Sequence, residues 1–141
     1  MKRVISVIVI GLVVPTMVWA ERFKKNGDLV YDSKTELTWQ SSPSSQKFNW
    51  SDAQNYCNNL SYGGQSDWRL PNIYELKSLV DYTKYNPAIA TDLINIDTDY
   101  PYYWSSSKDI DDSSSAWFVF FKDGYDDWYY ESSKFLALCV R

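Results

Sequence analysis

The sequence predicts an α+β domain in which two helices pack on a small, mostly antiparallel, twisted sheet with long loops. Two observations indicate the helices: Asn72 and Glu75 form a capping box, and apolar residues repeat at helical spacing after Trp50. A third observation indicates the sheet, because short aromatic and β-branched runs fill residues 103–140 around an Asp123-Gly124 turn. A sheet segregated from its helices along the chain is typical of α+β domains.

The first twenty residues predict a secretory signal peptide. Two basic residues precede an apolar run over residues 4–18, and Ala20 supplies a small residue for cleavage. This run is shorter than the roughly 20 residues of a membrane span and contains Pro15, although an uncleaved anchor remains the alternative. We expect a signal peptide at residues 1–20 and one secreted, periplasmic or surface domain at residues 21–141, with no membrane span after cleavage.

Charge argues against a nucleic-acid partner. The chain has 14 basic and 18 acidic residues, and loss of two basic residues with the signal takes its net charge from −4 to −6. Its one basic cluster, Arg22, Lys24 and Lys25, lies at the expected new N-terminus. Since nucleic-acid recognition needs basic patches that neutralise phosphates, we expect no nucleic-acid binding.

The N-terminal part predicts a hairpin followed by a helix. Asn26-Gly27 is a tight-turn signal, and residues 29–31 and 37–39 are expected to be two short strands. After a polar loop, Asn49 or Ser51 caps the first helix. The apolar face of this helix would contain Trp50, Ala53, Cys57 and Leu60.

The second helix follows an extended stretch. Leu70 precedes a proline and so favours extended geometry, and the capping box of Asn72 and Glu75 then starts a helix. Arg69 would point away from the core and form an ordinary solvated ion pair with Asp67 or Glu75. The helix begins at about residue 73 and buries the stripe Ile73, Leu76, Leu79 and Val80.

The rest of the chain predicts a long loop and then a sheet. Residues 88–102 have no sustained period, although Leu93, Ile94 and Ile96 indicate a partly buried turn. The expected strands are residues 103–106, 116–121, 125–130 and 135–140. The last of these is apolar on both faces, which predicts a central strand covered on both sides.

Several specific motifs occur in order along residues 23–141. They are Trp50-Ser51-Asp52-Ala53, Tyr56-Cys57, Leu60-Ser61-Tyr62-Gly63-Gly64, Ser66-Asp67-Trp68-Arg69-Leu70-Pro71-Asn72, Glu75-Leu76, Tyr103-Trp104-Ser105-Ser106 and Cys139-Val140-Arg141. With them the chain resembles the Lcl C-terminal domain family, which is similar in turn to the C-type-lectin-like fold also used by formylglycine-generating-type domains. The resemblance implies a C-type-lectin-like domain, an extracytoplasmic bacterial location, and attachment or ligand binding. It supplies no catalytic residues.

The two cysteines, Cys57 and Cys139, predict one disulfide bond. An even count in an oxidising compartment favours a bridge, and the spacing gives no support to two redox-active thiols. The pair also matches the terminal-strand bridge of the lectin-like fold. The copper-site cysteines of formylglycine-generating enzymes therefore do not carry over, and we expect no cofactor.

No catalytic or metal-binding residues are expected. The chain has no histidine, so the commonest general base, the usual catalytic triad and the commonest zinc ligand are missing. The serine runs at residues 105–107 and 113–115 have no activating neighbour in sequence and are interpreted as strand-edge and loop residues.

The acidic run at residues 109–112 resembles half of a calcium loop. It lacks the glycine and the distal glutamate of an EF-hand, so a solvated acidic loop is the favoured interpretation. The sugar-binding lectin-like proteins carry W-N-D and E-P-N motifs, and Trp104-Ser105-Ser106 and Asn86-Pro87-Ala88 do not match them. Calcium-dependent sugar binding is not implied.

Three aromatic or acidic stretches predict a ligand surface: residues 97–103, 109–115 and 125–130. In the last of them, alternation places Trp128 and Tyr130 on one side and Tyr125 and Tyr129 on the other, so at least one pair should stay partly exposed. An exposed ring beside carboxylates suits a sugar or a cationic protein patch, although rings that roof the core are the alternative. The candidate residues are Tyr100, Tyr102, Tyr103, Asp109, Asp111, Asp112, Tyr125 and Trp128.

Three function classes follow from these observations. The first is a secreted or surface binding and adhesion module that recognises a glycan or protein at a cell or matrix surface. The second is a structural or assembly subunit of an extracytoplasmic complex, either oligomeric or attached to a pilus-like or matrix structure, since aromatics that pack on a copy of the chain look the same in sequence. The third is an enzyme of the formylglycine-generating-like fold, which the missing catalytic residues disfavour.

Overall fold

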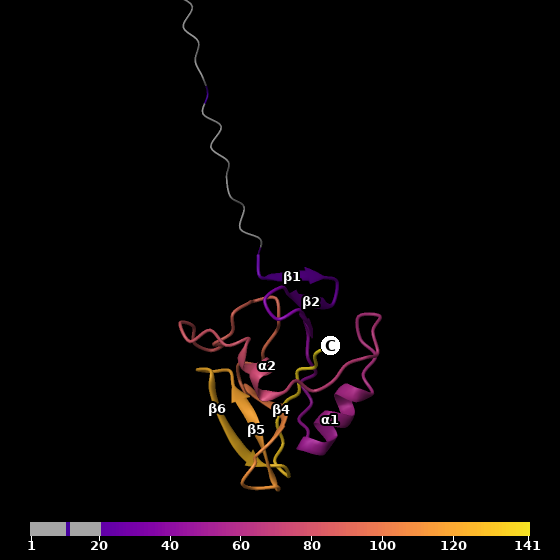
Figure 1. Cartoon of the computed structure of the whole chain (residues 1–141), viewed down its shortest axis with the longest axis vertical. Coiled ribbons are helices and arrows are strands. Elements are labelled where there is room, and N and C mark those ends of the chain that lie inside the picture. Colours follow the sequence, from indigo (N-terminus) through magenta and orange to yellow (C-terminus); the bar gives the residue numbers. More distant parts are fainter. Residues whose placement is uncertain (1–10, 12–20) are drawn as a thin grey trace, which may run out of the picture.

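The computed structural model describes residue 11 and residues 21–141, so apart from residue 11 the predicted signal peptide lies outside the described residues. The described chain forms a small α+β domain with two helices, as predicted, but its strands form two three-stranded antiparallel sheets instead of the one sheet expected. Figure 1 shows one sheet where residue 21 enters the domain and the other at the opposite end, with the helices beside them. Within the described residues, no helix is long and apolar enough to cross a membrane.

The first sheet has the strand order β1 (Phe23–Asn26), β2 (Leu29–Asp32) and β3 (Leu37–Gln40). The predicted hairpin is confirmed as β2 and β3. The expected tight turn joins β1 to β2, and there Gly27 has a φ of 59°, a left-handed conformation that favours glycine. Sequence analysis does not predict β1, because only Phe23 of this strand is buried and no apolar alternation marks it.

A buried carboxylate holds this sheet to the rest of the domain. Asp32 is fully buried, and the Arg22 guanidinium donates to it through Nε at 2.8 Å and through Nη2 at 2.7 Å. The same Nη2 donates to the carbonyl oxygen of Ser78, and Lys34 N–H and the Thr35 hydroxyl also donate to Asp32. Burial raises the pKa of Asp32, but these hydrogen bonds and the charge of Arg22 outweigh it and hold that pKa below its ordinary value.

The first helix is α1 (Trp50–Asn58). Of the two expected caps, Asn49 is the one used: its side chain accepts from Asp52 N–H at 2.8 Å. Ala53 and Cys57 are buried and anchor the helix to the core. The helix ends before Leu60, which packs against the core from the following turn.

The second helix, α2 (Ile73–Lys77), starts at the predicted residue with both hydrogen bonds of the capping box present. It is shorter than the predicted apolar stripe. Leu79 and Val80 lie beyond it, because the backbone of Val80 pairs with Ile89 and that of Leu79 accepts from Ala90 N–H. The last two apolar residues of the predicted stripe therefore lie in a turn and a β-bridge, and not in a longer helix.

The structure decides between the two expected ion-pair partners of Arg69, which are Asp67 and Glu75. Arg69 forms two parallel hydrogen bonds with Glu75, at 2.7 and 2.6 Å. Asp67 pairs instead with Arg141, whose Nε lies 2.6 Å from Asp67 Oδ1. The motif around Trp68 thus fastens both the start of α2 and the last residue of the chain.

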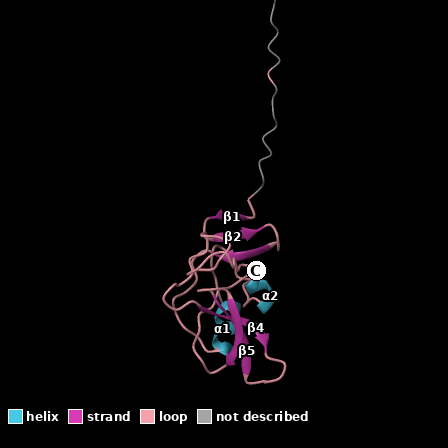
Figure 2. Cartoon of the chain, turned by 90° about the vertical axis from the view of Figure 1, so that its left-hand side faces the viewer, coloured by secondary structure: helices cyan, strands magenta, loops and turns pink. Residues whose placement is uncertain are grey.

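The second sheet contains β4 (Tyr102–Lys108), β5 (Ser115–Phe120) and β6 (Tyr125–Tyr130), in that order. These strands confirm three of the four predicted runs. β6 is an edge strand, since among residues 21–141 only β5 pairs with it. Figure 2 shows this sheet at the far end of the domain from β1 and β2.

The fourth predicted strand, at residues 135–140, is wrong. Those residues make only isolated bridges: Phe135 to Phe48, Leu136 to Tyr103, and Val140 to both Trp39 and Arg69. The bridge at Leu136 is parallel and the others are antiparallel, so no continuous ladder forms.

Burial of the same segment agrees with the prediction, because every side chain from Phe135 to Val140 is buried. The segment lies between two core clusters and alternates between them. Leu136, Leu138 and Val140 join the cluster that contains Trp39 and Leu76. Phe135, Ala137 and Cys139 join the cluster that contains Trp68 and Trp104.

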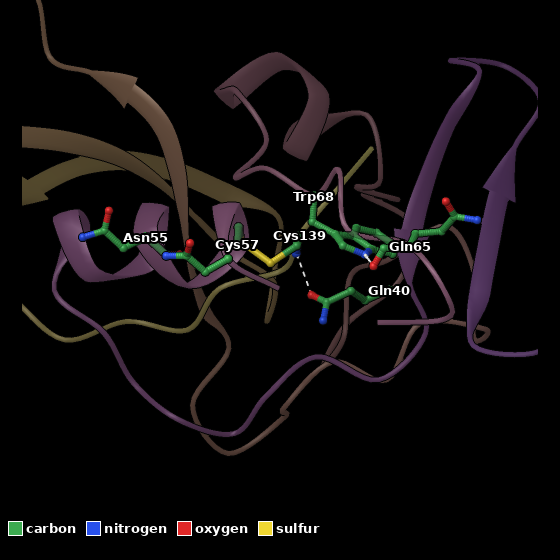
Figure 3. The surroundings of a disulfide bond; sticks show 7 residues. Gln40, Asn55, Cys57, Gln65, Trp68 and Cys139 are labelled. Carbon is green, nitrogen blue, oxygen red and sulfur yellow. Dashed lines mark hydrogen bonds between the residues drawn. A yellow bond between two sulfur atoms is a disulfide. The ribbon is translucent and has the colours of Figure 1, made fainter. Parts of the chain in front are cut away.

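The predicted disulfide bond between Cys57 and Cys139 is confirmed. Figure 3 shows that it joins α1 to the C-terminal segment, with both cysteines fully buried. Nearby, Cys139 N–H donates to the side-chain oxygen of Gln40 at 2.8 Å. The bridge thus crosses the centre of the domain and links two segments that no strand ladder connects.

The predicted long loop between α2 and β4 is present and partly buried. Ile94 and Ile96 are buried and Leu93 packs against the core, as expected. The loop is attached to both halves of the domain, since Asn95 N–H donates to Ser41 O at 2.8 Å and Ala88 N–H donates to Phe121 O at 2.7 Å.

Candidate ligand-binding surface

The register of the β4–β6 sheet sorts its aromatic side chains onto two faces. Trp128 lies opposite Trp117 and Tyr129 lies opposite Ala116, and residues opposite each other point to the same face. One face, which we call the groove face, carries Tyr102, Phe118, Phe120, Tyr125 and Tyr129. The other, the α2 face, carries Tyr103, Trp117, Val119, Trp128 and Tyr130.

The edge strand exposes rings on both faces. The exposed fractions are 53% for Tyr125, 43% for Trp128, 49% for Tyr129 and 55% for Tyr130. The expectation that at least one pair stays partly exposed is therefore met by both pairs. The reason is position in the sheet, since neither helix covers the outer side of β6.

A groove of about 500 Å³ opens on the groove face. The Tyr102 ring lies at the centre of its ring cluster, with centroids 5.0 Å from Tyr100, 5.2 Å from Phe135 and 4.5 Å from Phe120. The groove is lined by Tyr100, Tyr102, Phe118, Tyr129, Ser133, Lys134 and Phe135. Five aromatic rings thus form one concave surface.

Polar groups surround these rings. The Tyr100 hydroxyl donates to the carbonyl oxygen of Lys134 at 3.0 Å, and the Lys47 ammonium lies 3.6 Å from the centroid of the Tyr100 ring. Burial, with Tyr102 and Tyr129 nearby, raises the pKa of Tyr100, so its hydroxyl stays protonated at neutral pH. Among the described residues, the Tyr102 and Tyr129 hydroxyls have no hydrogen-bond partner and remain able to bind a ligand.

The α2 face has a groove of about 370 Å³, and its charged groups are paired with one another. Lys77 Nζ lies 2.9 Å from Asp126, and Lys108 Nζ lies 3.0 Å from Glu131. The hydrogen bond with Asp126 raises the pKa of Lys77. This groove is lined by Ile73, Tyr74, Lys77, Ser107, Lys108, Trp117 and Asp126. With fewer rings and with ion pairs at its rim, it is the less suitable of the two for stacking.

The acidic loop lies at the end of the sheet where β5 starts, the end at which Tyr129 of the groove pairs with Ala116, but none of its carboxylates lines the groove. Asp112 accepts hydrogen bonds from Ser114 N–H, from the Ser114 hydroxyl and from the Ser115 hydroxyl, and these lower its pKa. Asp109 and Asp111 are nearby, with Asp111 N–H 3.5 Å from Asp109 Oδ1. Within residue 11 and residues 21–141, no group of three or more acidic or cysteine side chains is placed to hold a metal ion.

The structure separates the predicted ligand residues. Tyr100 and Tyr102 line the groove, and Tyr125 lies on the same face near the β5–β6 turn, where its hydroxyl donates to Asp127 at 2.5 Å. Trp128 lies on the opposite face. Asp109, Asp111 and Asp112 follow β4, at the end of the sheet where β5 starts. One surface therefore does not contain them all.

Tyr103 belongs to the core rather than to a ligand surface. Only 1% of it is exposed, and its hydroxyl accepts from Asp97 N–H at 3.0 Å. Burial raises its pKa to about 12. A bulge in the β4–β5 register follows Trp104, and before it Tyr103 pairs with Val119 on the covered side of the sheet. Alternation from Tyr102, an accessible residue, is the signal that could have assigned Tyr103 to the covered face.

Sequence analysis does not predict several groove residues. Tyr129 could have been found, since it shares a side with Tyr125 in the alternation of β6. Phe135 could not, because its run predicts a central strand and only the isolated bridge to Phe48 turns its ring towards Tyr102. Lys47 comes from a loop whose position depends on tertiary contacts alone.

Comparison with family profiles gives a match over most of the chain. The profile described as the Lcl C-terminal domain matches residues 28–141, which extend from the β1–β2 turn to the last residue. No curated protein matches the chain at a stringent threshold. The matched range contains both cysteines, the capping box and every residue that lines the aromatic groove.

Proposed function

Because this chain belongs to the Lcl C-terminal domain family, we propose that it is an extracytoplasmic binding or adhesion module that recognises a carbohydrate or protein partner and catalyses no reaction. The observation that carries the proposal is the groove around Tyr102, where five rings and unpaired hydroxyls form one concave surface. Binding sites commonly combine an aromatic lining with a small number of polar groups that orient the ligand.

A saccharide fits this groove best. A sugar ring has an apolar face of C–H groups that stacks on an aromatic ring, and a rim of hydroxyls that hydrogen-bond. The exposed ring of Tyr129 and the central ring of Tyr102 provide surfaces on which the apolar face of the sugar can stack. Their hydroxyls and Ser133 provide hydrogen-bonding partners for the sugar hydroxyls. The Lys47 ammonium, 3.6 Å from the centroid of the Tyr100 ring, adds a positive charge beside the groove.

The proposed location and fold have separate support. A signal-like segment over residues 1–20 and a fully buried disulfide bond favour export to an oxidising compartment. A bridge from α1 to the C-terminal segment is what the resemblance to the C-type-lectin-like fold leads one to expect, and the strands are antiparallel as expected, although they form two sheets where one was predicted. We include that fold in the proposal.

Absence of catalysis is supported by how polar side chains are used. The chain contains no histidine. Ser105 donates to Trp117 O at 2.8 Å, and the Ser107 hydroxyl accepts from Ile73 N–H at 3.0 Å, so both serines serve the fold. These contacts leave neither hydroxyl next to a general base.

The test is binding to an array of immobilised oligosaccharides. We expect the wild-type protein to bind a subset of the array, and Tyr129→Ala to bind that subset at least about tenfold more weakly, a loss of about 1.4 kcal/mol. Tyr102→Phe removes only a hydroxyl and should weaken binding by a smaller factor. Retained binding by Tyr129→Ala would overturn the assignment of the groove.

Trp128→Ala is the matched control. It removes a ring of similar exposure from the same strand, but from the α2 face. We expect its binding to equal that of the wild type. If Trp128→Ala and Tyr129→Ala lose binding equally, the ligand site is the β6 edge or the α2 face rather than the groove. Thermal unfolding of all three variants shows whether the fold is intact.

A further inference from the structure

The domain has an open strand edge at each end. β1 is an edge strand of the first sheet and β6 is an edge strand of the second. Figure 1 shows the two strands at opposite ends of the domain. An unpaired edge presents backbone N–H and C=O groups that can pair with another strand.

The hydrogen-bond pattern identifies the outward amides of β1. Ser33 N–H donates to Arg22 O at 2.8 Å, so Arg22 and every second residue after it face β2. The amides of Phe23 and Lys25 therefore point to the open edge.

The same argument applies to β6. Glu131 N–H donates to Ser114 O at 2.9 Å, so the odd-numbered residues of the strand face β5. The amides of Asp126, Trp128 and Tyr130 then point to the open edge. One of them is shielded, since Trp128 N–H donates to the side chain of Asp127 at 2.8 Å.

The two edges carry opposite charges. Lys24 and Lys25 are exposed and form no ion pair with any described residue. β6 carries adjacent carboxylates: Asp126, which also pairs with Lys77 at 2.9 Å, and Asp127, which also accepts from the Tyr125 hydroxyl. Carboxylates would oppose one another if two β6 strands paired, and lysines would do so if two β1 strands paired, so each edge disfavours its own copy and favours the other edge.

We propose that β1 of one copy of this protein adds antiparallel to β6 of a second copy. In the register that we infer, Lys25 lies opposite Asp126, Lys24 opposite Asp127 and Phe23 opposite Trp128. This register also satisfies the backbone. The outward N–H and C=O groups of Lys25 pair with those of Asp126. Those of Phe23 pair with those of Trp128 when the Trp128 N–H exchanges its hydrogen bond with Asp127 for one with Phe23 O.

Such a contact is heterologous, because one copy contributes β1 and the other contributes β6. Repeated head-to-tail, it closes into a ring or grows as an open chain. This assembly goes beyond ligand binding at the aromatic groove, because it would present several grooves on one particle and raise the avidity for a repetitive surface.

Charge reversal of each edge tests the proposal by analytical ultracentrifugation of the purified protein. We expect wild-type protein to associate with rising concentration, less so at high salt. Lys24→Glu/Lys25→Glu and Asp126→Lys/Asp127→Lys should each associate about tenfold or more weakly. Their equimolar mixture should associate again, because each variant then supplies the edge that its partner lacks.

Lys34→Glu/Lys84→Glu is the matched control for Lys24→Glu/Lys25→Glu, since it makes the same change in net charge at exposed positions outside both edges. We expect it to associate as the wild type does. Wild-type protein that stays monomeric at every concentration would overturn the proposal, as would variants that associate normally or a mixture that does not recover. If a double variant fails to fold, the milder pair Lys24→Glu and Asp127→Lys repeats the design.

Discussion

Tryptophan has opposite environments in two regions of this domain. In the scaffold formed by the helices and the C-terminal segment, Trp68 and Trp104 are buried and their indole N–H groups donate to backbone carbonyls, as Trp104 does to Phe48 O at 2.9 Å. On the edge of the β4–β6 sheet, Trp128 is 43% exposed. Trp39 differs from both groups, because it is fully buried but its indole N–H has no acceptor among the described residues.

The comparison shows what the family motifs do. The motif around Trp68 supplies a buried ring, the Arg69–Glu75 ion pair and the cap of α2. The cysteines of two other motifs form the disulfide bond. These residues build the scaffold, whereas the rings of β6 lie outside the motifs and face solvent. Membership of the family therefore explains the fold directly and the ligand only indirectly.

Loss of the disulfide bond should have the largest effect on the scaffold. The cysteines are 82 residues apart, and for a loop of that size the chain-entropy relation gives about 4.5 kcal/mol of stabilisation. We expect Cys57→Ser to lower the free energy of unfolding by about this amount, measured by chemical denaturation. An unchanged denaturation midpoint would contradict a structural role for the bridge.

Substitution of a buried tryptophan should have the next largest effect, and substitution of an exposed tryptophan serves as its comparison. Trp104→Ala leaves a cavity in the core and removes a hydrogen bond, and should cost about 4 kcal/mol. Trp128→Ala should cost about 0.5 kcal/mol or less, because the ring is partly solvated in the folded protein. Equal losses in thermal and chemical denaturation would show that the β6 edge is part of the scaffold.

Asp32→Asn should cost about 2 kcal/mol at neutral pH, because it removes the charge that Arg22 pairs with. The pKa of Asp32 is below its ordinary value of 3.8 in the folded protein. The stabilisation is therefore fully present above about pH 4 and is lost as the pH falls through the lowered, folded-state pKa. Denaturation from pH 7 to pH 2 should show the wild type and the variant converging in acid. A constant difference would contradict this role.

Among the scaffold features, the capping box should have the smallest effect. Asn72→Ala removes one of the two reciprocal hydrogen bonds at the start of α2 and should cost about 1 kcal/mol. Tyr74→Ala, two residues later in the helix, removes a side chain that is 81% exposed and serves as the control. We expect a lower thermal midpoint for Asn72→Ala alone. If Tyr74→Ala lowers the midpoint as much, Tyr74 packs against a neighbour in solution.

Sequence patterns predicted the local features of this domain well. The α+β class, the start of α2 at Ile73, the cap at Asn49 and the Asp123-Gly124 hairpin all depend on residues within a few positions of one another. Hydrogen bonds of that range form in the same way whatever the rest of the chain does. The cysteine pairing was also predictable, because two cysteines allow only one bridge.

Tertiary structure alone decided the features that depend on distant partners. An apolar run at residues 135–140 is compatible with a central strand. Its neighbours, however, belong to different parts of the fold and run in different directions, so the run forms a buried segment with isolated bridges and no ladder. The same partners decided the groove: Phe135 and Lys47 reach Tyr100 and Tyr102 only after the two core clusters have packed. Alternation in β6 assigned its rings to two sides, and only the edge position of that strand left both sides exposed.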